Sequence, residues 1–157
     1  MEHHRTVLEE ARALLDGDRL DEAAIRASEA LAAIDSESTQ AAEHPGGLDV
    51  AIPGLESLSE LGGDAEELLA EIAFKKGDFA DALDRSYRAI RRSSRFRALP
   101  HFIAGEALHK LGDTELAIGK FKIILEFAGQ AGLKTKAKQR IDELLDELGA
   151  GGHELTC

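Results

Sequence analysis

The residues best suited to metal chemistry are Glu106 and His109, which form one E-x-x-H motif. On a helix this spacing places both side chains on one face, as in helical bundles that bind a pair of iron ions. Such a site needs a second E-x-x-H motif and two further glutamates, and the sequence holds a single such motif. We therefore expect no metal site and no cofactor.

Other catalytic patterns are missing from the sequence as well. A glycine-rich phosphate loop follows a strand, and no stretch alternates apolar and polar residues as strands do. The serines cluster without a histidine and an acid at a spacing that would indicate a catalytic triad. We expect a protein that is not an enzyme.

A run of arginines is the second chemical feature, in a chain whose net charge is −11. It can be interpreted as a site for phosphate, RNA or an acidic protein surface. It can also be the positive C-terminal end of a helix that neutralises acidic neighbours, which we favour. The net charge argues against nucleic acid as the main partner. This basic stripe comprises Arg85, Arg88, Arg91, Arg92 and Arg95.

The elements that must position these residues are helices. Apolar residues recur every three or four positions, for example at Leu8, Ala11 and Leu15. Gly-Asp pairs at 17–18, 77–78 and 112–113 separate consecutive amphipathic segments. Glycine adopts the left-handed conformation after a helix end at no steric cost, so each pair predicts a turn between two antiparallel helices.

The domain organisation follows from these turns. Residues 1–34 form a first helical hairpin, and 35–63, with prolines and paired glycines, form a loop-rich insert. Asp64 caps the next helix, so that 64–149 hold two hairpins and a single amphipathic helix ended by Gly149. Residues 150–157 form a flexible tail.

The second and third hairpins repeat one pattern, KKGDFADALDRSYRAI at 75–90 and KLGDTELAIGKFKIIL at 110–125. With glycine at the turn and small residues after it, the sequence resembles the tetratricopeptide repeat (TPR) family. The resemblance implies an all-α fold of stacked helical hairpins, a TPR-like α-solenoid, with a C-terminal capping helix. The first hairpin fits with one extra residue in its turn. Glu66 and His101 stand where the family has a large residue early in the first helix.

The resemblance also implies a concave groove lined by the first helix of each hairpin. An acidic groove with phenylalanines favours a ligand that carries basic and apolar residues. Alternatively, the glutamates form a solvated helix face paired with Lys75 and Arg97. The groove-facing residues on the family's register are Glu67, Glu71, Phe74, Lys75, Phe102, Glu106 and His109.

Together these features indicate a non-catalytic interaction module, an adaptor or assembly scaffold that binds a peptide or helix of another protein. The alternatives are a self-associating scaffold, which includes a homo-oligomer formed through the C-terminal helix, and a binder of anionic ligands through the basic stripe. No apolar run is long enough for membrane insertion. The N-terminus does not resemble a signal peptide and the one cysteine is Cys157, so we expect a cytoplasmic protein.

Overall fold

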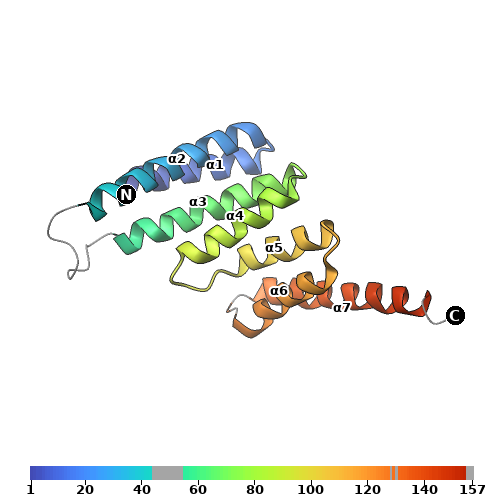
Figure 1. The fold of residues 1–157 in the computed structure, drawn as a ribbon. Coiled ribbons are helices and arrows are strands. Elements are labelled where there is room, and N and C mark those ends of the chain that lie inside the picture. Colours follow the sequence, from blue (N-terminus) through green and yellow to red (C-terminus); the bar gives the residue numbers. More distant parts are fainter. Residues whose placement is uncertain (44–54, 128, 130, 155–157) are drawn as a thin grey trace.

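The computed structural model describes residues 1–43, 55–127, 129 and 131–154, and within them every regular element is a helix. Six helices form three antiparallel hairpins that stack in chain order, and a seventh helix follows them (Figure 1). This confirms the all-α fold of stacked hairpins. The helices are α1 (Glu2–Asp16), α2 (Leu20–Ala42), α3 (Leu55–Lys75), α4 (Phe79–Arg92), α5 (Ala98–Lys110), α6 (Thr114–Phe127) and α7 (Ala131–Glu154).

The three hairpin turns have the same backbone structure. Gly77 and Gly112 have φ of 82° and 90°, and their amides bond to the carbonyls three residues earlier. In the first turn this place belongs to Asp18, with φ of 60°, whereas Gly17 has φ of −83°. Our assignment of the left-handed position to Gly17 was therefore wrong. The first turn has no extra residue, because Asp18 occupies the glycine's place.

Small residues lie where the two helices of each hairpin meet. Counted from the left-handed turn residue, the fifth position is Ala23, Ala82 or Ala117, and each is fully buried. An alanine at this position lets two helix backbones approach closely, which explains why the pattern recurs in every hairpin.

Residues 35–63 are not a loop-rich insert where the structure describes them, and this prediction was wrong. The helix α2 continues to Ala42 and α3 begins at Leu55, so Asp64 lies inside a helix and caps nothing. Residues 44–54 lie outside the described residues. The predicted helix end at Gly149 was likewise wrong, because α7 continues to Glu154 and residues 150–154 of the predicted tail are helical. Glycine lowers helix propensity without excluding the helical conformation. Residues 155–157 lie outside the described residues.

The paired glycines inside α3 have a packing role. A Cβ atom on Gly62 would lie 2.7 Å from Nη1 of Arg92, and one on Gly63 would lie 3.0 Å from Nη2 of Arg97. The two glycines thus leave space for arginine side chains to cross the surface of α3. A glycine makes a helix about 1 kcal/mol less stable than an alanine does, and the space for the arginine side chains compensates for this cost.

Candidate functional site

The first helices of the hairpins line the concave side of the array. The backbones of α1 and α3, of α3 and α5, and of α5 and α7 approach one another closely, whereas those of α2 and α4, or of α4 and α6, do not within the described residues. A stack whose first helices are closer together than its second helices curves toward the first helices. The resulting concave side is therefore formed by α1, α3, α5 and α7.

The predicted groove carboxylates lie on this side, and each is paired with an arginine from a neighbouring segment. Arg12 of α1 donates from Nη1 and Nη2 to Glu71 at 2.6 and 2.9 Å. Arg140 of α7 donates from Nε to Oε1 of Glu106 at 2.5 Å. These bidentate pairs connect successive first helices and leave the two carboxylates little uncompensated charge.

Glu67 is a weaker case of the same arrangement. Its Oε2 lies 3.5 Å from Nη1 of Arg97, the residue directly before α5. Burial raises the pKa of the Glu67 carboxyl, and the attraction of Arg97 offsets this only in part. Of the alternative in which the glutamates form a solvated face paired with Lys75 and Arg97, the structure shows the Arg97 contact, but Glu67 is not fully solvated and no ion pair within the described residues includes Lys75.

The remaining groove residues have different surroundings. Phe74 and Phe79 pack edge to face with ring centroids 5.3 Å apart, and Phe102 packs likewise on Phe121 at 5.2 Å. Lys75 is exposed at the end of α3. His109 lies beneath α7, where its Nε2 is 2.9 Å from Oε2 of Glu147. The structure therefore covers the third hairpin's groove face with α7.

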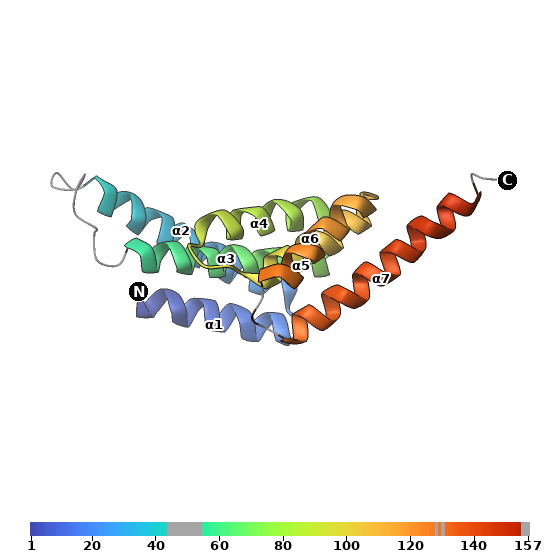
Figure 2. The same ribbon diagram turned by 90° about the horizontal axis from the view of Figure 1, so that it is seen from below.

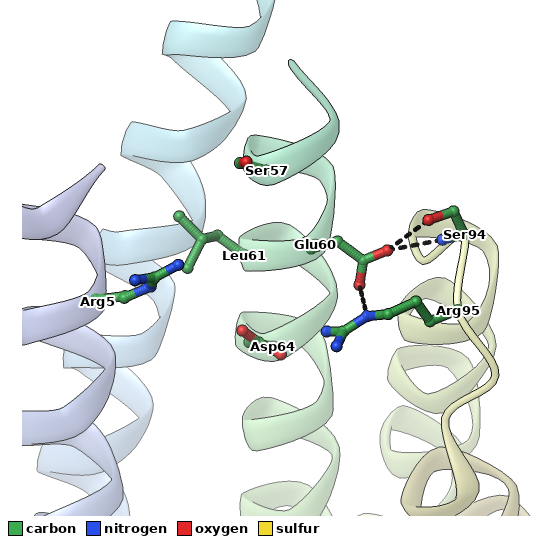
Figure 3. A pocket seen from close by; sticks show the side chains of 7 residues that line it. All are labelled: Arg5, Ser57, Glu60, Leu61, Asp64, Ser94 and Arg95. Atoms are coloured by element: carbon green, nitrogen blue, oxygen red, sulfur yellow. Dashed lines mark hydrogen bonds and ion pairs between the residues drawn. The ribbon is translucent and has the colours of Figure 1, made fainter. Parts of the chain in front are cut away.

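The open part of the concave side is a trough between α1 and α3. Two adjoining depressions of about 430 and 400 Å³ share Arg5, Leu61 and Asp64, so they form one continuous trough. One follows α1 and α3, and the other reaches the segment between α4 and α5 (Figure 3). The remaining lining residues are Leu8, Glu9, Arg12, Ser57, Glu60, Glu67, Leu68, Ser94 and Arg95.

Glu60 holds one wall of this trough in place, and sequence reasoning missed it. Its carboxylate accepts hydrogen bonds from Ser93 Oγ at 2.7 Å and from the Ser94 amide at 2.8 Å, and it binds Arg97 at 2.9 Å. Burial raises the pKa of Glu60, but these bonds outweigh it and hold the pKa well below its usual range. Figure 3 shows Glu60 turned toward Ser94 and Arg95, with Arg5 beyond Leu61.

The arginines of the basic stripe mostly pair within the chain. Arg92 donates to Asp35 at 2.7 and 3.2 Å, and Arg85 donates to the buried Glu66 at 3.0 Å. Arg88 pairs with Asp84 at 2.9 Å, one helical turn away. Arg95 lies 3.3 Å from Glu60, and Arg91 is exposed. The stripe is therefore divided among several acidic neighbours instead of forming one cationic surface.

The arrangement of helices and turns defines a TPR-like fold. The C-terminal TPR-containing domain of a Plasmodium falciparum protein described as FK506-binding has a similar structure, with a TM-score of 0.72 at 14% identity. The match covers 96% of this chain and 91% of that domain. A TPR-like protein from Chlorobium tepidum matches with a TM-score of 0.60 at 18% identity, over 95% of this chain and 94% of that one.

No family model and no curated protein matches the sequence. The structural likeness, at these identities, concerns the fold. Among the described helices, none combines the length and the apolar character that crossing a membrane requires.

Proposed function

We propose that this protein is a non-catalytic interaction module, an adaptor or assembly factor that binds an extended segment of another protein in the trough between α1 and α3. TPR-like arrays typically bind other proteins through their concave side, which supports this class of function. The observation that carries the proposal is the continuous trough on that side, which shares Arg5, Leu61 and Asp64 between its two parts. A cytoplasmic location stays a prediction.

The chemistry of the trough modifies the expected ligand. A purely basic ligand is not favoured, because Glu71 and Glu106 already bind arginines of the chain itself. Arg5 and Glu9 lie one turn apart on the exposed face of α1, and no ion pair includes either within the described residues. We therefore infer a peptide that carries both charge signs, which would pair with Arg5 and Glu9.

Binding of an anionic polymer through the basic stripe is less well supported. Arg85, Arg88 and Arg92 each pair with a carboxylate of the chain, so a phosphate would have to displace an existing partner. The net charge of −11 also repels polyanions at long range.

The test is a charge exchange on α1. A double variant Arg5→Glu, Glu9→Lys keeps the net charge and alters exposed side chains only. We expect it to lose partners that wild type recovers from a lysate of the source organism, and to weaken their purified binding at least about tenfold. The matched control is Lys122→Glu, Glu126→Lys, an exposed pair with the same spacing on α6. Partners retained equally by all three proteins would place binding outside the trough.

A further inference from the structure

The charges of α7 are divided into two blocks. Residues 131–140 hold four cations and no anion, whereas 141–150 hold four anions and no cation. Helices are stabilised by anions near their N-terminus and by cations near their C-terminus, so this order is the reverse of what the helix dipole favours. The dipole therefore does not explain the pattern. The charged residues are Lys134, Lys136, Lys138 and Arg140, then Asp142, Glu143, Asp146 and Glu147.

The rest of the chain compensates only part of these charges. Arg140 binds Glu106 and Glu143, and Glu147 contacts His109. No ion pair within the described residues includes any of the three lysines, Asp142 or Asp146, and all of them except Lys134 are exposed. A basic block and an acidic block on one helix thus both face solvent.

An apolar edge runs along the same helix. Ala137, Ile141 and Leu144 are buried against the third hairpin, but Leu145 is 49% and Leu148 is 40% exposed. The helix α7 has 24 residues and α6 has 14, and the C-terminal part of α7 extends beyond the hairpins (Figures 1 and 2). Lys134 and Lys138 are four residues apart and Leu145 and Leu148 are three apart, and these spacings fit the alternation of four and three residues found in coiled coils, with the buried Ile141 between the two pairs.

We propose that α7 is a self-association element that pairs antiparallel with α7 of a second copy of this chain. Antiparallel pairing sets the basic block of each helix against the acidic block of the other, whereas parallel pairing would set like charges together. Leu145 and Leu148 then contact the partner's basic half, where the methylene stems of Lys134 and Lys138 provide apolar surface. One helix with both blocks is self-complementary about a two-fold axis, which is why the occupant is a second copy.

The expected association is weak and sensitive to salt. A helix of 24 residues is about 36 Å long, so one pair of helices buries less surface than a large permanent interface. Attraction between exposed charges is screened by salt. The trough between α1 and α3 lies at the other end of the array, so a dimer would carry two troughs and bind a partner with two copies of its motif more tightly.

The first experiment follows the mass of the full chain by sedimentation at increasing concentration, at low and high salt. Variant A carries Lys134→Glu, Lys136→Glu and Lys138→Glu, and variant B carries Asp142→Lys and Asp146→Lys. Wild type should dimerise, less strongly at high salt. Each variant alone should dimerise at least about tenfold more weakly, because like charges then face each other. An equimolar mixture of A and B should recover a mixed dimer.

The second experiment tests the apolar edge. Leu145→Ser with Leu148→Ser should weaken the dimer, while helicity by circular dichroism stays unchanged because both side chains are exposed. The matched control replaces two exposed apolar residues elsewhere, Ile25→Ser on α2 and Leu116→Ser on α6, which are 59% and 56% exposed. A chain that remains monomeric at every concentration would overturn the proposal. So would a dimer that none of the α7 variants weakens, or an α7 that binds a different protein while the chain stays monomeric.

Discussion

At the scale of single residues, the array is unusual at two equivalent positions of its second and third hairpins. Glu66 and His101 both stand where the repeat pattern has a large side chain, and both are buried, at 1% and 8% exposure. Each also keeps one side-chain atom without a hydrogen-bond partner within the described residues, Oε1 of Glu66 and Nδ1 of His101. Of the two, His101 makes the stability of the protein depend on pH.

His101 should make the protein less stable in mild acid. Burial, and secondarily the charge of Lys120, lowers the pKa of His101 from 6.5 to about 4. Between these values the unfolded chain binds a proton that the folded chain does not, so stability falls as pH decreases from 6.5 toward 4. His101→Phe preserves stacking on Phe96, whose ring lies 5.2 Å away. Between pH 4 and 6.5 the free energy of unfolding, measured with urea, should rise with pH less steeply in this variant than in wild type, by about 1.4 kcal/mol per pH unit. An unchanged slope would contradict the assignment.

Asp18 is the second residue whose effect on stability can be measured. Its φ of 60° is strained for a side chain but free of strain for glycine. We expect Asp18→Gly to raise the free energy of unfolding by about 0.5–1 kcal/mol. This is the strain that is relieved, less the entropy that the more flexible glycine loses on folding. The same change at Asp78, which has φ of −86° and caps α4, should lower it. Thermal unfolding of the two variants would show opposite shifts, and equal shifts would argue against the turn assignment.

At the scale of elements, the surroundings of a helical glycine decide its effect. A Cβ on Gly105 of α5 would lie 2.7 Å from Cζ of Phe121, a ring that is fully buried. A Cβ on Gly119 of α6 would meet nothing within 4 Å. Gly105 thus lets α5 and α6 pack together, whereas Gly119 only lowers helix propensity.

These two glycines should respond oppositely to the same substitution. We expect Gly105→Ala to lower the free energy of unfolding by about 1–3 kcal/mol, because Phe121 must move within a packed core. Gly119→Ala should raise it by about 1 kcal/mol through helix propensity. Urea denaturation measures both values on the same chain. A stabilised Gly105→Ala variant would contradict the close approach of α5 to α6.

At the scale of the whole molecule, the core is a series of clusters along the array. One cluster joins α1, α2 and α3, a second joins α3, α4 and α5, and a third joins α5, α6 and α7. The first and third clusters share no buried residue. Stability in such arrays depends on each hairpin and its contact with the next, so damage at one end should remain local.

This arrangement predicts that a core substitution in α7 destabilises the C-terminal helices more than the N-terminal ones. Leu144 is 1% exposed and belongs to the third cluster, so Leu144→Ala should cost about 2–5 kcal/mol of local stability. Hydrogen exchange read by mass spectrometry should show lost protection in α6 and α7 and unchanged protection in α1 and α2. A uniform loss across all helices would instead indicate one cooperative unit.

Much of the fold could be predicted because the repeat pattern is local. The turn after α3 and the buried Ala82 and Ala89 depend on residues within one hairpin, where helical spacing suffices. The length of α3 could not be predicted in this way. Gly62 and Gly63 lower the helix propensity of this stretch, and only the tertiary structure shows that they leave space for the side chains of Arg92 and Arg97.

The candidate site was less predictable than the fold for the same reason. By itself, the sequence determined the helical class and the hairpins, since these depend on spacing along one helix or between two neighbouring helices. Only the tertiary structure decided that Arg12 and Arg140 bind Glu71 and Glu106, and that Glu60 holds the segment after α4. Such pairs join residues that are a repeat or more apart in the chain. Stacking of the hairpins brings these residues together, and the spacing of residues within one helix does not indicate which of them will meet.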